Sequence, residues 1–151
     1  MAKATQATEL AAVKSLLLDT GPLVAYLDAR DPAHGEAAAC VDAFSGDLHT
    51  TGAVITEAMR LVGGGAAGPA LLAEFVTASR TRVHHFAQPA DLRAAAALMA
   101  KYADTPMDYA DATLVLLAER IDVFDVLTLD RRGFSVYRTR KGPALRILAG
   151  P

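Results

Sequence analysis

The chain has 151 residues, of which 52% are hydrophobic and 21% charged, and its mean hydropathy is +0.24. This composition excludes global disorder, which requires few apolar residues and a high net charge, and the length predicts a single domain. The longest uninterrupted apolar run, Ala94 to Ala100, is far shorter than the roughly 20 residues of a transmembrane helix, so we expect no membrane span. The single cysteine, Cys40, excludes an internal disulfide and favours a reducing, cytoplasmic location.

Charge is unevenly distributed along the chain, although the formal net charge is only −2. Residues 131–151 contain six basic side chains and no acid, whereas residues 1–130 contain nine basic and seventeen acidic ones, a local net charge of −8. Two interpretations of the basic C-terminal segment stay open. It is either a solvated surface or a strip that contacts phosphate groups.

The first half of the chain alternates between predicted strands and helices. A polar, alanine-rich extension covers residues 1–14, which we expect to be flexible, and the folded domain covers residues 15–150. The apolar run Ser15–Asp19 is typical of a buried strand, and Pro22 is suited to open a helix over 23–28. The pattern then predicts a helix over 31–44, a strand over 47–51, a helix over 52–62, a glycine-rich loop over 63–68 and a helix over 69–79.

The second half continues this alternation. It predicts a strand over 82–86, helices over 89–103 and 105–120, and strands over 126–130 and 145–148. The helix over 105–120 has the clearest start, because Thr105 fits the N-cap, Pro106 the first helical position and Asp108 the end of a capping box. Short apolar strands that alternate with helices indicate parallel β–α–β units, so the predicted fold is one three-layer α/β domain.

Five acidic residues are expected to converge at one edge of the sheet. Asp19 and Asp130 each end an apolar run, and the carboxyl ends of parallel strands lie on the edge where open α/β sheets bind ligands. Asp108 and Asp111 lie three residues apart at the start of a helix, so they share a face. Glu57 interrupts a helix that is otherwise largely apolar.

Carboxylates that are gathered in this way repel one another unless protons or cations neutralise them. Hard divalent cations such as Mg²⁺ take oxygen ligands, and a bound metal can activate water and stabilise charge on a phosphate oxygen. No His/Cys set has the spacing of a zinc site, so the sequence predicts magnesium rather than zinc. Structural alternatives remain for four of the acids: a helix cap for Asp108, a turn residue for Asp19 and for Asp130, and an exposed helix position for Glu57.

The remaining candidates for chemistry are weaker. His84 and His85 are adjacent in a predicted strand, so their side chains point to opposite faces and do not form a paired site. His34 and His49 are isolated in the sequence, and Cys40 fits a buried position in an apolar helix. Neither a GxxxxGK[ST] nor a GxGxxG pattern is present, so a nucleotide cofactor has no support.

Four segments resemble the signatures of a known family. The stretch from Leu16 to Asp28, LLLDTGPLVAYLD, looks like the opening of PIN-domain nucleases, especially the VapC-type toxins of toxin–antitoxin modules. Further matches follow in the family's order: TTGAVITEA over 50–58, PMDYADATLV over 106–115 and VLTLDRRGF over 126–134. The resemblance extends over residues 15–148.

The resemblance implies a PIN-like fold, in which a parallel sheet of about five strands lies between helices, and cleavage of RNA that depends on Mg²⁺ or Mn²⁺. It implies a quartet of catalytic and metal-binding acids, which are Asp19, Glu57, Asp111 and Asp130. Thr128 corresponds to the hydroxyl near the last acid, and Asp108 is an additional acid of the signature. We expect Arg131, Arg132, Arg138 and Arg140 to contact the RNA backbone, because cationic side chains supply phosphate affinity.

The predicted function is therefore a metal-dependent endoribonuclease, the toxin of a type II toxin–antitoxin pair, with a cognate antitoxin and a homodimer implied by the family. One alternative is a non-catalytic PIN-like module that binds RNA or a protein, against which the retained acids argue. Another is a metal-dependent phosphoesterase that uses Asp19 as a nucleophile. Such enzymes carry Asp-x-Asp, and here Gly21 stands in place of the second aspartate.

Overall fold

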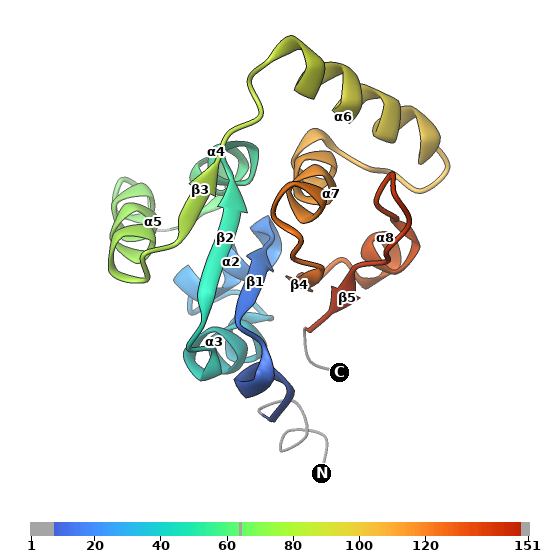
Figure 1. Ribbon diagram of the computed structural model, residues 1–151. Helices are drawn as coiled ribbons and strands as arrows, with labels where there is room; N and C mark the ends of the chain where they lie inside the picture. The colour runs from blue at the N-terminus through green and yellow to red at the C-terminus, as the bar shows by residue number, and fades with distance from the viewer. Residues whose placement is uncertain (1–7, 64, 149–151) are drawn as a thin grey trace.

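The computed structural model describes residues 8–63 and 65–148 of the chain. Within these ranges, five strands form one sheet in the order β3-β2-β1-β4-β5 (Figure 1). The strands are β1 (Ser15–Leu18), β2 (Asp47–Thr51), β3 (Arg82–His84), β4 (Asp125–Leu127) and β5 (Arg146–Ile147). All four neighbouring pairs are parallel. The predicted α/β fold with a five-stranded parallel sheet is confirmed.

Helices form the connections and flank the sheet (Figure 1). They are α2 (Thr20–Leu27) and α3 (His34–Ala43) between β1 and β2, α4 (Gly52–Leu61) and α5 (Ala67–Ala78) between β2 and β3, α6 (Pro89–Lys101) and α7 (Tyr109–Ile121) between β3 and β4, and α8 (Arg131–Val136) between β4 and β5. Across the described ranges, no helix is both long and apolar enough to cross a membrane.

The core is built around β1 and α7. Leu16, Leu17 and Leu18 of β1 are at most 1% exposed, as expected of a central strand that is covered on both faces. Every residue of α7 from Ala112 to Ala118 is buried. The first turn of this buried helix carries Asp111, so the position of that carboxylate is fixed by the packing of the core.

The predicted start of the helix over 105–120 is wrong. The structure places Asp108 at the N-cap of α7, and its Oδ1 accepts a hydrogen bond from the Asp111 backbone N–H at 2.8 Å. The Asp111 side chain accepts the Asp108 N–H in return at 3.2 Å, which completes a capping box three residues later than expected. Pro106 stays outside the helix, and its carbonyl oxygen accepts a hydrogen bond from the Tyr137 hydroxyl at 2.8 Å.

Residues 131–136, for which the sequence predicted no element, form the short helix α8. Asp130 caps this helix by accepting the Gly133 backbone N–H at 3.0 Å. The predicted strand over 126–130 is therefore shorter, and β4 ends at Leu127. Asp19 acts similarly for α2, which begins at Thr20 rather than at Leu23, because the carboxylate accepts the Thr20 N–H at 2.7 Å.

The expected N-terminal extension falls partly on residues 1–7, which lie outside the described residues. Residues 8–12 are helical. Leu10 is 2% exposed and Val13 is 9% exposed, and both belong to the core cluster. This part of the chain therefore contributes to packing.

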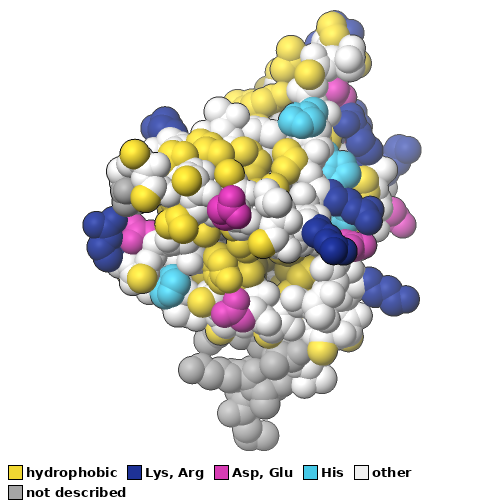
Figure 2. Space-filling view, turned by 90° about the vertical axis from the view of Figure 1, so that its left-hand side faces the viewer, with side chains coloured by type: hydrophobic (Ala, Val, Ile, Leu, Met, Phe, Trp, Pro, Cys, Tyr) yellow, Lys and Arg dark blue, Asp and Glu magenta, His cyan; other side chains and the backbone are white. Residues whose placement is uncertain are grey.

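One face of the molecule is rich in apolar side chains. Figure 2 shows these side chains gathered on the side that α5 occupies in Figure 1. Leu71 of α5 is 51% exposed, and Met59 and Leu61 of α4 are 37% and 47% exposed. We refer to Met59, Leu61 and Leu71 as the α4–α5 apolar residues.

The packing of residues 8–13 gives a test of the fold. Leu10→Ala should lower the free energy of unfolding by about 2–4 kcal/mol, because it removes a buried side chain from the core. The neighbouring exposed substitution Glu9→Ala should change it by less than about 0.5 kcal/mol. Urea denaturation of the two variants measures both values. Equal effects would contradict the assignment of Leu10 to the core.

Candidate active site

Three of the predicted acids are helix N-caps at one edge of the sheet. Asp19 follows β1 and caps α2, Asp130 lies three residues after β4 and caps α8, and Asp108 caps α7. β1 and β4 are neighbours, and the strand order reverses between them, which is the position where open α/β sheets bind ligands. The N-terminus of each helix also favours negative charge.

Asp19 is the most deeply buried of these carboxylates, with 6% of its surface exposed. Its Oδ1 accepts the Thr20 backbone N–H at 2.7 Å, and its Oδ2 accepts the Thr128 hydroxyl at 2.6 Å. Burial raises the pKa of Asp19 to about 6, and these two hydrogen bonds oppose the rise. The charges of Asp108 and Glu57 raise the pKa further.

Thr128 connects the two strand ends that carry Asp19 and Asp130. Its buried hydroxyl donates to Asp19, and its oxygen accepts the Asp130 backbone N–H at 3.0 Å. Thr128 orients the Asp19 carboxylate by donating its hydroxyl proton to it. The same hydroxyl oxygen holds the backbone of Asp130 by accepting its N–H. The structure thus brings together three of the residues that the sequence predicted.

Glu57 lies on α4 and is held by the first residue of α2. The Thr20 hydroxyl donates to Glu57 Oε2 at 2.8 Å. Thr20 therefore lies between two of the acids, since its backbone N–H binds Asp19. Its role was missed in the sequence, where Thr20 is recognisable only as part of a turn.

A pair of hydroxyl groups joins the starts of the helices that carry Glu57 and Asp111. The Thr51 and Thr113 hydroxyl oxygens lie 2.8 Å apart, and both residues are buried. Thr113 donates its proton to the Ala110 carbonyl oxygen at 2.7 Å, so Thr51 is the donor between the two hydroxyls. Thr51 also accepts the Val54 N–H at 3.2 Å and thereby caps α4. The starts of α4 and α7 are thus locked together.

Asp111 has the most strongly shifted pKa of the acids in this site, raised to about 8. Burial is the largest cause, followed by the negative charges of Asp19 and Asp108, with Asp130 as a smaller contribution. The hydrogen bond from the Asp108 N–H partly opposes the rise. Since Glu57 acts on Asp19 in the same way, the five predicted carboxylates share one electrostatic environment.

The chemistry of these donors fits a hard divalent cation. The ligand atoms on offer are carboxylate oxygens, and the pKa values of Asp19 and Asp111 are raised first by burial and then by neighbouring negative charge, both of which a bound cation would offset. In the part of the chain that the structure describes, no three Asp, Glu, His or Cys side chains already form a closed ligand set.

Tyr137 is a further residue of the site that the sequence did not reveal. It is fully buried beside Phe134 and Tyr102, with ring centroids 5.3 and 5.1 Å away. Its hydroxyl donates to Pro106, and burial together with the nearby carboxylates raises its pKa, so the proton stays on the oxygen. Gly133 leaves the room for this arrangement, because a Cβ atom there would lie 2.8 Å from the Tyr137 hydroxyl oxygen.

Three of the four predicted RNA-contacting arginines have partners within the chain. Arg131 forms an ion pair with Glu36 at 3.2 Å, and Arg140 forms one with Glu119 at 2.8 Å. Arg138 donates to three carbonyl oxygens at the end of α8, at 2.9–3.0 Å. The guanidinium of Arg132 has no hydrogen bond or ion pair with any residue the structure describes.

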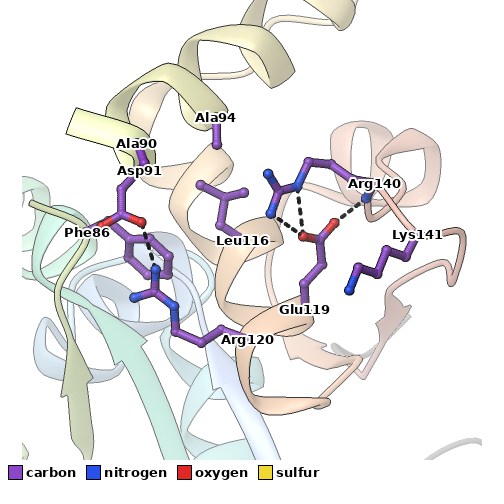
Figure 3. A pocket seen from close by; sticks show the side chains of 9 residues that line it. All are labelled: Phe86, Ala90, Asp91, Ala94, Leu116, Glu119, Arg120, Arg140 and Lys141. Atoms are coloured by element: carbon purple, nitrogen blue, oxygen red, sulfur yellow. Dashed lines mark hydrogen bonds and ion pairs between the residues drawn. The ribbon is translucent and has the colours of Figure 1, made fainter. Parts of the chain in front are cut away.

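Figure 3 shows where Arg140 is held. Arg140 and Glu119 line a pocket of about 340 Å³ between α6, α7 and the segment after α8. A second arginine there, Arg120, binds Asp91 at 2.8 Å and lies over the Phe86 ring, 4.0 Å from its centroid. The two arginines are neutralised inside the pocket.

The sequence suggested that His49 is isolated, but the structure places it beside His84. Its Nδ1 lies 3.0 Å from Nε2 of His84 across β2 and β3, and burial lowers the pKa of both rings. His34 Nδ1 contacts the Ala25 carbonyl oxygen at 2.8 Å. Cys40 is buried, as expected.

Comparison with known proteins identifies the family, although no family model matches the chain. Ribonuclease VapC26 of Mycobacterium tuberculosis (strain ATCC 25618 / H37Rv) is 33% identical over 136 residues, which cover 88% of this chain and 99% of that protein. The chain belongs to the VapC family of ribonuclease toxins of toxin–antitoxin systems. A crystal structure of VapC20 from M. tuberculosis, described as a Sarcin-Ricin loop cleaving toxin, matches with a TM-score of 0.70 and 19% identity. That match covers 77% of this chain and 90% of the VapC20 chain, and it confirms the VapC fold.

The raised pKa of Asp111 predicts how stability depends on pH without divalent cations. Between its ordinary pKa of 3.8 and the folded value of about 8, the folded state binds more protons than the unfolded state, so this group lowers stability as pH rises. Asp111→Asn removes the charge and keeps an oxygen that can accept the Asp108 N–H. The variant should therefore be more stable than the parent at pH 8.5, and the gain should vanish near pH 4.

Denaturation of both proteins in EDTA at the two pH values measures this effect. Asp104→Asn, at an exposed acid outside the site, is the matched control and should show no pH-dependent gain. If Asp111→Asn stabilised the protein equally at both pH values, the ionisation of Asp111 would not be the cause of the gain in stability.

Proposed function

We propose that this VapC-family chain is a metal-dependent endoribonuclease that hydrolyses phosphodiester bonds in RNA. One observation carries the proposal: Asp19 and Asp111 share the β1–β4 switch point, each with a raised pKa. Such an arrangement is unfavourable in a protein that only binds RNA, whose backbone carries the same charge. It is suited to a site that concentrates a divalent cation beside a phosphate.

The metal proposed is Mg²⁺ or Mn²⁺, held by Asp19, Glu57, Asp111 and Asp130. When bound, such an ion supplies activation of water and stabilisation of negative charge on a phosphate oxygen. The role of the protein is to fix the ligands beforehand. Thr128 and Thr20 hold the Asp19 and Glu57 carboxylates, at 2.6 and 2.8 Å.

Asp108 is assigned to positioning. Both capping-box hydrogen bonds join it to Asp111, and its charge contributes to the raised pKa of that residue. The alternative of a phosphoesterase with Asp19 as nucleophile has less support. Both Asp19 oxygens already accept hydrogen bonds, and the carboxylate is buried.

Among the four arginines predicted to contact RNA, Arg132 is the strongest candidate, because the other three are engaged within the chain. Arg131 and Arg140 would have to exchange a carboxylate partner for a phosphate. For Arg131 the loss of the ion pair with Glu36 would change the free energy of unfolding little, since an exposed ion pair contributes little to stability. Arg138 is committed to the end of α8.

The partners proposed are a cognate antitoxin and a second copy of the chain. The family implies both, and the α4–α5 apolar residues support a protein partner, because exposed apolar patches mark interaction surfaces. Light scattering of the purified chain distinguishes the two partners. If the chain is a dimer and Leu71→Asp makes it a monomer, the α4–α5 apolar residues form the interface between two copies of the chain. A cytoplasmic location also stays a prediction.

Cleavage of end-labelled structured RNA tests the proposed activity. The purified chain with Mg²⁺ or Mn²⁺ should produce discrete cuts. EDTA should abolish them, and Asp19→Asn should slow them by about a hundredfold or more, the scale on which loss of one charge-stabilising group acts.

Asp104→Asn is the control for this assay, since it removes an exposed acid outside the site and should leave the rate unchanged. Cuts that persist in EDTA or in Asp19→Asn would contradict the metal-dependent mechanism. RNA that is bound but left intact in Mn²⁺ would support the non-catalytic module instead.

A further inference from the structure

A cleft of about 470 Å³ opens next to the acidic cluster, between α4 and the start of α7. Its lining residues are Ala53, Thr56, Glu57 and Arg60 of α4 together with Asp108, Tyr109 and Ala110. Glu57 and Asp108 belong both to this cleft and to the cluster of carboxylates. The cleft is therefore continuous with the proposed active site.

Arg60 is the one basic side chain among the residues that line this cleft. It lies three residues after Glu57 on the same face of α4, so an ion pair between the two would be expected. No such pair forms among the described residues, and Glu57 Oε2 accepts the Thr20 hydroxyl. The Arg60 guanidinium has no hydrogen bond or ion pair with any residue in the described ranges, unlike Arg120, Arg140 and Arg146, which each hold a carboxylate.

The rest of the lining is largely apolar. Ala53 and Ala110 lie on α4 and α7, and Tyr109 adds an aromatic side chain whose hydroxyl is fixed by donating to the Phe86 carbonyl oxygen at 2.9 Å. An RNA nucleotide carries an anionic phosphate and a planar base on its ribose. The cleft offers one unpaired cation for the phosphate and an apolar, partly aromatic wall for the base.

We propose that this cleft binds a nucleotide next to the scissile bond, with its phosphate on Arg60 and its base against Ala53, Tyr109 and Ala110. Glu57 and Arg60 are three residues, about 4.5 Å along the helix axis, apart. A phosphate that neighbours the one at the acids can therefore reach the guanidinium. This inference rests on the proposed endoribonuclease activity, and it makes Arg60 a substrate-binding residue.

The test uses single-turnover cleavage of an RNA that the parent chain cuts, measured against protein and salt concentration. Arg60→Gln should raise the half-saturating concentration about tenfold, and the maximal rate should change by less than about threefold. The slope of log affinity against log salt should fall by about 0.7, the value for one phosphate contact to a single strand. Arg60→Lys should restore most of this slope, because it keeps the charge.

Two further variants separate binding from folding effects. Arg93→Gln removes a positive charge that is also exposed, from α6 and outside the cleft, and should leave both constants unchanged. Ala53→Leu fills the cleft from its apolar side and should also raise the half-saturating concentration. Thermal melting shows whether each variant is folded.

Failure of this inference can be told apart from failure of the proposed function. If the parent chain cuts no RNA, the endoribonuclease proposal itself fails. If the parent cuts and Arg60→Gln keeps its affinity and salt slope, this cleft does not bind substrate and the inference is overturned. Loss of antitoxin binding in Arg60→Gln, with unchanged RNA affinity, would assign the cleft to a protein partner and would overturn it equally.

Discussion

The burial of carboxylates beside one another is the constraint on which this structure depends. Asp19 and Asp111 have raised pKa values because burial and neighbouring acids disfavour their charged forms. The fold tolerates the cluster by placing Asp19, Asp108 and Asp130 at helix N-termini, where backbone N–H groups donate to them. A divalent cation would remove the remaining repulsion, which explains why a costly arrangement is built into the sheet edge.

Buried threonine hydroxyls make this arrangement rigid. Thr128 and Thr20 each hold one acid, and the Thr51–Thr113 pair locks the helices that carry Glu57 and Asp111. A buried hydroxyl without a partner would be destabilising, and among the described residues every buried side-chain oxygen and nitrogen has a partner. The same hydrogen bonds that satisfy the core therefore orient the ligands of the site.

The sequence predicted those parts of the site that local patterns determine. Asp19 and Asp130 end apolar runs, and a parallel sheet brings such ends to one edge, so their convergence followed from the predicted parallel arrangement alone. The capping box at Asp108 was placed three residues too early, because Thr105 and Asp108 offer the same local signal. In the structure Pro106 stays outside the helix and its carbonyl oxygen accepts the hydroxyl of Tyr137, 31 residues away.

Other features depend on partners that no local pattern reveals. Thr51 and Thr113 are 62 residues apart, and Arg140 is neutralised by Glu119 rather than left for RNA. Counting charges along residues 131–151 therefore overestimated how many cations are free. Arg60 was overlooked for the opposite reason, since its expected partner Glu57 is bound elsewhere.

Proton release on Mn²⁺ binding tests the central claim most directly. Calorimetry in buffers of different ionisation enthalpy gives the number of protons lost when the ion binds. If Asp111 is largely protonated at neutral pH without metal, binding should release protons at pH 7 and fewer at pH 9. Binding without proton release at pH 7 would show that the carboxylates are already ionised, and it would contradict the claim that burial and the neighbouring negative charges keep a proton on Asp111.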